Sequence, residues 1–347
     1  MGPCRRPHGF RILNTQIIVS AVDYHTAGEP FRIISGGVPA ILGDTVLDKR
    51  LYAMENLDHI RELVINEPRG HADMYGCFVI EPDDLDADFG AVFFHNAGYS
   101  TACGHGTIAL AVWALEGGLV NMAEPETLIT IDVPSGRLET VAAVEDGRVE
   151  SVRFRNVPSF VYAEGLTVET SVGQVATDIA FGGAFYTCVA AQDVGLGLEA
   201  ANLADFISLG REIKDSINDE HEILHPLEPR LRDIYGTIFF AEKEGAGSLR
   251  QRNVTVFADG EVDRSPCGSG TSARLALLDD SGRLLRGDAL SHESIIGTEF
   301  GGRVVGETRV GEFDAVITEV EGNAHLTGYH QFVLRRDDPL GTGFLLR

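Results

Sequence analysis

A seven-residue pattern occurs twice in this chain of 347 residues, and it constrains the fold more than any other feature. Cys103-Gly-His-Gly-Thr-Ile-Ala109 and Cys267-Gly-Ser-Gly-Thr-Ser-Ala273 agree at five of seven positions. Each copy opens a helical run. Thr107–Leu115 is apolar on every side, and a helix without a polar face must be buried all round, while Thr271–Leu278 is rich in Ala and Leu. Unless small residues recur here by chance, the repeat predicts two similar mixed α/β halves that face each other across a cleft, each a sheet wrapped around one central helix.

The rest of the chain alternates between short strand-like runs and a few helical stretches. Thr45 followed three residues later by Asp48 is a capping-box pattern, and we expect it to open a helix that extends through Ile60. A further helical stretch is expected over Glu199–Ser216, and a join between the halves near residues 135–150. Strands are predicted at Gln16–His25, Phe31–Ser35, Glu62–Asn66, Gly76–Glu81 and Gly90–His95, with a series of short strands over Leu128–Val189.

The chain is strongly acidic, with a formal charge of −24 at pH 7. Nucleic acids and anionic membranes are recognised by clustered Lys and Arg, so neither is an expected partner. No run approaches the ~20 apolar residues that span a bilayer. Residues before about Thr15 look like a loose leader without the features of a signal peptide. The five cysteines form no spaced framework, and their odd number favours a reducing cytoplasm.

Two of these cysteines occupy the same place in the repeat. Cys103 and Cys267 each start a helix, where the first backbone N–H groups have no intrahelical acceptors and favour an anion. We expect this position to lower the pKa of both thiols. Two facing loops would grip one carboxylate and place a sulfur on each face of the carbon that bears it. Cys77 and Cys188 lie in apolar runs and are expected to be core residues, and Cys4 lies in the leader.

Other site chemistries fit the sequence less well. Cys103 and His105 do not have the spacing of a standard zinc site. A Walker-type phosphate loop and a hydrolase nucleophile elbow are both absent. No lysine lies in the Gly/Ser-rich setting of a pyridoxal-phosphate site. We therefore expect neither a metal nor an organic cofactor.

The two cysteine loops resemble the active-site loops of the proline racemase superfamily. The first is Ala102-Cys-Gly-His-Gly-Thr107, and the second is Asp263-Arg-Ser-Pro-Cys-Gly-Ser-Gly-Thr271. The likeness extends over nearly the whole chain, through Asp23-Tyr-His-Thr-Ala-Gly-Glu-Pro30, Asn66-Glu-Pro-Arg-Gly-His71, Phe181-Gly-Gly-Ala-Phe-Tyr186, and Asp338-Pro-Leu340 with Gly343-Phe344.

This resemblance implies a diaminopimelate-epimerase-like α/β fold with the active site between two pseudo-symmetric halves. The last strand of that fold returns to the first half. We therefore expect residues 1–140 with 330–347 to carry Cys103, and residues 141–329 to carry Cys267. The implied mechanism needs no cofactor: a thiolate on one face of the substrate removes the α-proton, while a thiol on the other face donates one.

The resemblance also implies which residues bind the substrate. The backbone of Gly104, His105, Gly268 and Ser269 would hold the carboxylate, and Asp263 with His105 would face the ring nitrogen. A structural role for His105 and a loop-capping role for Asp263 remain open alternatives. The implied partner is a small imino acid, either proline or a hydroxyproline, and the family suggests monomers or homodimers.

Three stretches resemble the trans-3-hydroxy-L-proline dehydratase branch of the superfamily: Arg69–Tyr75, His95–Ser100 and Gly182–Tyr186. That branch commonly has Thr where this chain has Cys267. A thiol returns a proton far more readily than a threonine hydroxyl, so we expect racemisation or epimerisation. Dehydration of 3-hydroxyproline is the alternative, and dual activity stays open. A non-catalytic imino-acid-binding protein would use the same loops but would not need two thiols.

Overall fold

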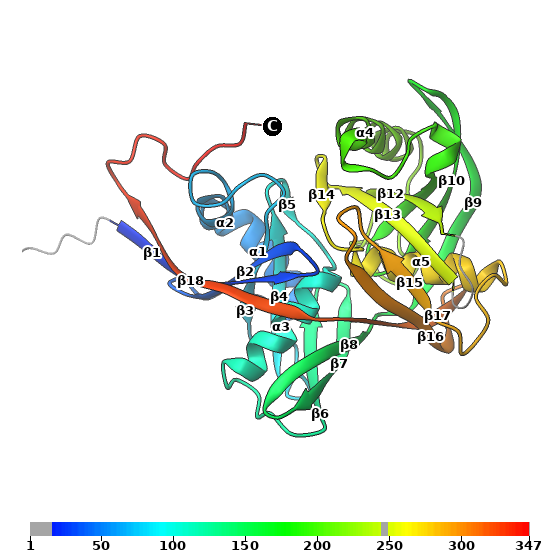
Figure 1. Cartoon of the computed structure of the whole chain (residues 1–347). Coiled ribbons are helices and arrows are strands. Elements are labelled where there is room, and N and C mark those ends of the chain that lie inside the picture. Colours follow the sequence, from blue (N-terminus) through cyan, green and yellow to red (C-terminus); the bar gives the residue numbers. More distant parts are fainter. Residues whose placement is uncertain (1–15, 244–248, 347) are drawn as a thin grey trace, which may run out of the picture.

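The structure, a computed structural model, describes residues 16–243 and 249–346 (Figure 1). The leader with Cys4 lies outside the described residues. The first elements are β1 (Gln16–Thr26), β2 (Glu29–Gly36), α1 (Val46–Asn56), α2 (Asp58–Ile65), β3 (Tyr75–Ile80), β4 (Phe89–His95), β5 (Gly98–Tyr99), α3 (Gly104–Glu116), β6 (Glu126–Val133), β7 (Gly136–Glu145) and β8 (Arg148–Arg155).

The second part of the chain begins with β9 (Ser159–Thr170), β10 (Gly173–Phe181) and β11 (Phe185–Ala190), followed by two short 3-10 helices, Ala191–Val194 and Ala200–Asn202. It continues through α4 (Leu203–Glu220), β12 (Ile234–Glu242), β13 (Leu249–Phe257), β14 (Glu261–Asp263), α5 (Gly268–Asp280), β15 (Leu290–Glu293), β16 (Glu299–Val310), β17 (Phe313–Gly322) and β18 (Ala324–Arg335).

Each copy of the repeat forms the start of a central helix, as predicted. In α3 every residue from Gly104 to Leu115 is buried except Trp113, and in α5 every residue from Gly268 to Leu278 is buried. The first helix packs against β1, β2, β7 and β8, and the second against β9, β10, β16 and β17. The mixed α/β fold class is therefore confirmed.

The strand pairing repeats in the same order around the two helices. β2 pairs in parallel with β3, β3 in antiparallel with β4, and β4 in parallel with β6. The same order occurs in the second part of the chain: β11 pairs in parallel with β12, β12 in antiparallel with β13, and β13 in parallel with β15. Through these pairings and those of the remaining strands, all eighteen described strands belong to one hydrogen-bonded sheet. The two halves are thus built to one plan.

Two connections join these parts. β8 and β17 pair in antiparallel through residues 152–155 and 319–322. β18 then runs back across the molecule and pairs with β1 along its whole length, as Figure 1 shows. The boundary expected at residue 140 falls inside β7, and the one at residue 330 falls inside β18. The exact division into halves stays a proposal.

The local predictions were mostly confirmed. The capping box is present, since Thr45 Oγ1 accepts from the Asp48 N–H at 3.1 Å and the Asp48 carboxylate accepts from the Thr45 N–H at 3.2 Å. The single helix expected beyond it ends at Asn56, and a second begins at Asp58. The strand expected at Glu62–Asn66 was wrong, because Leu63, Val64 and Ile65 are the buried face of α2. None of the described helices is long and apolar enough to cross a membrane.

Candidate active site

The amino-terminal ends of α3 and α5 meet between the halves. A Cβ built on Gly104 would lie 2.4 Å from the Cα of Gly268, a distance that real Cβ atoms do not show. Glycine at both positions therefore lets the two cysteine loops touch through their backbones. The loops also share internal hydrogen bonds: Thr107 Oγ1 donates to the Cys103 carbonyl, and Thr271 Oγ1 to the Cys267 carbonyl, each at 2.8 Å.

A small cavity lies where the loops meet. All seven residues singled out from the sequence line it, namely Cys103, Gly104, His105, Asp263, Cys267, Gly268 and Ser269. Its volume is about 10 Å³, which is space for roughly one water molecule. In this structure the two loops therefore lie so close together that the space between them holds nothing larger than a water molecule.

Five further residues line this cavity and were not assigned to the site from the sequence: Tyr75, Ala102, Tyr186, Tyr235 and Phe257. Tyr75, Ala102 and Tyr186 do lie within the stretches that carry the resemblance, and a second signal was present for Tyr75 and Tyr235. Tyr75-Gly76 and Tyr235-Gly236 are the same dipeptide, and they lie at the start of β3 and β12, which are equivalent strands of the two halves. Their hydroxyl groups lie 3.0 Å apart, and Tyr75 also donates to Ser100. The wall beside the thiols is therefore rich in hydroxyl groups.

Cys103 is the N-cap of α3, and its sulfur accepts a hydrogen bond from the Gly106 N–H at 3.3 Å. The imidazole of His105 is also close, with Nε2 at 3.4 Å and Nδ1 at 3.6 Å from the sulfur. Burial nevertheless raises the pKa of the Cys103 thiol well above its usual value, and the nearby Asp263 carboxylate adds to this effect. The lowering expected from the helix terminus is present but is outweighed by burial.

Cys267 has a different environment. Its backbone adopts a left-handed conformation with φ of 64°, which is strained for a residue with a side chain. The sulfur lies 3.8 Å from both the Tyr186 hydroxyl and the Ser269 hydroxyl, which are 2.7 Å from each other. Burial, together with the nearby Asp263 carboxylate, raises the pKa of Cys267 to about 12, although the Gly270 N–H and these two hydroxyl groups oppose the shift. Burial thus favours the protonated form of both thiols in the ligand-free site.

His105 and Asp263 lie together across the cleft. Nδ1 of His105 is 3.7 Å from Oδ2 of Asp263, and both side chains are almost completely buried. The rings of Phe31 and Tyr75 pack edge-on against the imidazole, with ring centroids 5.6 Å and 5.0 Å from its centroid. Asp263 also accepts a hydrogen bond from the Ser265 N–H at 2.8 Å, so its loop-capping role is real. That bond uses Oδ1, which leaves Oδ2 facing His105.

Charged residues on both sides of Asp263 hold its loop against the opposite half. Before it, Glu261 accepts from the Ala97 N–H at 3.0 Å and lies 3.4 Å from His95 Nδ1. After it, the backbone N–H of Arg264 donates to Glu29 at 2.7 Å. Glu29 is fully buried, and burial together with the charge of Asp263 raises its pKa. These contacts fix the position of Asp263 in the closed site.

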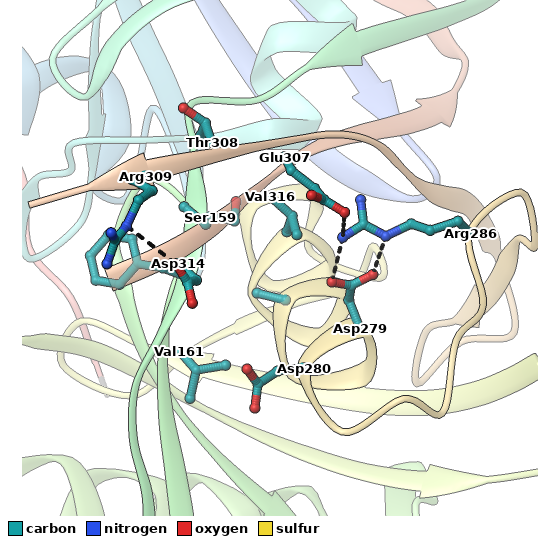
Figure 2. Close-up of a pocket in the computed structure, with 13 residues that line it drawn as sticks. Ser159, Val161, Asp279, Asp280, Arg286, Glu307, Thr308, Arg309, Asp314 and Val316 are labelled. Atoms are coloured by element: carbon teal, nitrogen blue, oxygen red, sulfur yellow. Dashed lines mark hydrogen bonds and ion pairs between the residues drawn. The ribbon is translucent and has the colours of Figure 1, made fainter. Parts of the chain in front are cut away.

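A larger cavity of about 510 Å³ lies away from the thiols, in the part of the chain that contains α5 (Figure 2). Its basic side chains are already paired: Arg286 lies 2.7 Å from Asp279 and 2.9 Å from Glu307, and Arg309 lies 3.2 Å from Asp314. Among the described residues, no group of three or more His, Cys, Asp or Glu side chains is arranged to hold a metal ion. The small cavity between the cysteine loops therefore remains the candidate active site.

Comparison with known proteins gives concordant results. The family model described as proline racemase matches residues 21–345. A trans-3-hydroxy-L-proline dehydratase from Azospirillum brasilense is 47% identical over 330 residues, and a 3-hydroxyproline 2-epimerase from Burkholderia multivorans is 46% identical over 330 residues. Each alignment covers 95% of this chain and 98% of the relative. A crystal structure of a hydroxyproline epimerase from Agrobacterium vitis, with bound trans-4-hydroxy-L-proline, superposes with a TM-score of 0.89 at 34% identity, covering 95% of this chain and 96% of that one.

Proposed function

The chain belongs to the proline racemase family, and on that premise we propose that it inverts the α-carbon of proline or a hydroxyproline, with Cys103 and Cys267 as a cofactor-free acid/base pair. It is an enzyme, either an isomerase or a hydro-lyase, so the alternative of a non-catalytic binding protein is set aside. The observation that carries the proposal is the meeting of two equivalent helix N-termini, each with one buried thiol, in a single cavity.

The proposed reaction begins when the imino acid enters between the separated halves. Its carboxylate accepts hydrogen bonds from the first backbone N–H groups of α3 and α5, at Gly104, His105, Gly268 and Ser269. Its ring nitrogen faces Asp263 and His105. The protonated nitrogen brings a positive charge beside two thiols whose pKa values are raised by burial and by a neighbouring carboxylate. Substrate binding thereby favours formation of the thiolate that the reaction needs.

The chemical step moves one proton off the α-carbon and another onto it. The thiolate on one face takes the α-proton and becomes a thiol, and the electron pair left on carbon is spread into the carboxylate. The thiol on the opposite face then gives its proton to that carbon and becomes the thiolate. The configuration is inverted, and the two cysteines have exchanged roles, so the reverse reaction starts from the other sulfur.

The test is product analysis by chiral chromatography with proline, 4-hydroxyproline and trans-3-hydroxy-L-proline as separate substrates. We expect inversion of at least one of the three, and we place 3-hydroxyproline first because of the epimerase relative and the hydroxyl-rich wall. Inversion of none of them would refute the proposal.

Dehydration of trans-3-hydroxy-L-proline is the second candidate. It is favoured by the dehydratase relative and by the hydroxyl groups of Tyr75 and Tyr235 beside the thiols. Here one thiolate takes the α-proton, the 3-hydroxyl leaves as water with a proton from the site, and the enamine formed becomes a cyclic imine. The same chromatography separates that imine from the inverted imino acid. A homodimer remains a proposal, as does a cytoplasmic location, which would keep the four described free thiols reduced.

A further inference from the structure

A second cavity lies beside the candidate active site, between the same two halves. Its volume is about 160 Å³. It is lined by Arg50 on α1, by residues 99–101, by Phe181, Ala184 and Phe185, and by residues 231–235. Tyr235 lines both this cavity and the one that holds the thiols. The Tyr235 hydroxyl lies 3.0 Å from that of Tyr75, which lines the thiol cavity, and Tyr75 donates to Ser100, which lines the second cavity.

Arg50 lines this second cavity without a carboxylate partner among the described residues. Its Nη2 donates to the Tyr99 carbonyl at 2.7 Å, but its Nε is buried without a hydrogen-bond partner. It makes no ion pair with any residue in the ranges 16–243 and 249–346. By contrast, Arg32 pairs with Asp23 and Arg61 with Asp58. Burial lowers the pKa of Arg50, so the protein does not favour its charge.

This missing partner is not explained by a shortage of acids. The chain has 52 Asp and Glu residues against 28 Lys and Arg. The one carboxylate that lines the same cavity, Asp233, lies 3.3 Å from the exposed Arg232. A partly buried guanidinium without a counter-ion is costly, and a bound anion would lower that cost. The planar donor set of arginine matches a carboxylate through two parallel hydrogen bonds.

We propose that Arg50 forms a second carboxylate-binding site, where the imino-acid substrate docks before it passes Tyr235 to reach the thiols. This inference rests on the proposed function. The closed catalytic cavity has no room for substrate, so the substrate waits outside until the halves separate. The overall charge of −24 disfavours the approach of an anionic group. Arg50 places a positive charge beside the carboxylate of the substrate and so offsets this effect.

The direct test is crystallographic, with 4-bromopyrrole-2-carboxylate soaked into crystals of the full chain. Bromine gives an anomalous signal, and we expect two peaks per chain, one between the cysteine loops and one beside Arg50. Arg50→Gln should lose the second peak and keep the first. A wild-type crystal without the peak at Arg50 overturns this inference, whether or not the variant folds. A peak at Arg50 without one between the loops instead counts against the proposed function alone.

The kinetic test asks whether the substrate uses this site. Arg50→Gln should raise KM for the imino acid about tenfold, the usual effect of losing one charge-assisted contact, with kcat within about twofold. Arg50→Lys keeps the charge and should recover part of the loss. The matched control is Arg153→Gln, because Arg153 makes an ordinary surface ion pair with Glu126 at 2.6 Å, and KM should not change. If 4-bromopyrrole-2-carboxylate binds at Arg50 but Arg50→Gln leaves KM unchanged, the substrate does not use the site and the inference fails.

Discussion

The substitution Gly104→Ala tests how closely the two cysteine loops must approach. The added Cβ would lie 2.4 Å from Gly268 Cα and 2.9 Å from Ser269 N, and these are backbone atoms that cannot rotate away. Ordinary contact begins near 3.4 Å, so the loops must move apart by about 1.0 Å. The strain from this clash falls on the contact between the two halves, and each half can shift as a unit to relieve it. We therefore expect each half to stay folded while the site loses its geometry.

A displacement of this size is expected to lower kcat by roughly 10²-fold. The cost in the free energy of unfolding should be about 1–3 kcal/mol, the usual range for overpacking, which corresponds to a fall of only a few degrees in melting temperature. Chiral chromatography and thermal unfolding measure the two effects. The control is Gly301→Ala in β16, whose nearest contact would be Glu321 Cβ at 3.8 Å, and it should change neither quantity. Full activity in Gly104→Ala would show that close contact of the loops is not required.

Three further predictions follow from the surroundings of the thiols. Tyr186→Phe removes the hydroxyl 3.8 Å from the Cys267 sulfur that helps to stabilise its thiolate, so the pKa of Cys267 should rise. The rate at which iodoacetamide alkylates Cys267, followed by mass spectrometry as a function of pH, should then rise only at higher pH. The control Tyr75→Phe should leave this pH profile unchanged. Equal pH profiles for wild type and Tyr186→Phe would contradict the reasoning. Pyrrole-2-carboxylate is planar at the carbon that bears its acid group, like the deprotonated intermediate, so it should bind more tightly than proline and compete with substrate. Failure to compete would count against the site. Cys267→Thr should lose inversion and keep or gain dehydration of trans-3-hydroxy-L-proline, because elimination does not return a proton to the α-carbon; a variant that still inverts its substrate would refute this.

Sequence patterns predicted the fold where local chemistry decides structure. The repeat predicted two buried helices, and the capping box at Thr45 predicted the start of α1. The pattern failed at Glu62–Asn66, because a short run of branched apolar residues suits a buried strand and a buried helix face equally. Only the packing of Leu63 and Ile65 against the first half distinguishes the two.

The site was predictable to the extent that it repeats. Cys103 and Cys267 follow from the duplicated loop. Tyr75 and Tyr235 could have been found through their shared Tyr-Gly dipeptide. The equivalence of their strands appears only in the structure, where β3 pairs in parallel with β2 and β12 pairs in parallel with β11. Tyr186 has no such signal, since the contact that matters joins β11 to the start of α5.

The electrostatics of the thiols could not be read from local sequence at all. A helix N-terminus lowers the pKa of a thiol, and burial raises it. Which effect is larger depends on how completely the two halves close over Cys103 and Cys267, and both sulfurs are fully enclosed here. Closure is a property of the contacts made by Glu261 and Arg264 with the opposite half.

The central claim is that two thiols act on opposite faces of one α-carbon. The measurement that tests it most directly is exchange of the α-hydrogen in deuterated water, followed separately from each enantiomer of a substrate that the wild type inverts. We predict that wild type incorporates deuterium and inverts both enantiomers. Cys103→Ser and Cys267→Ser should both lose inversion, and any exchange they retain should affect opposite enantiomers. Inversion at the wild-type rate by either variant, or exchange of the same enantiomer by both, would contradict the two-thiol account.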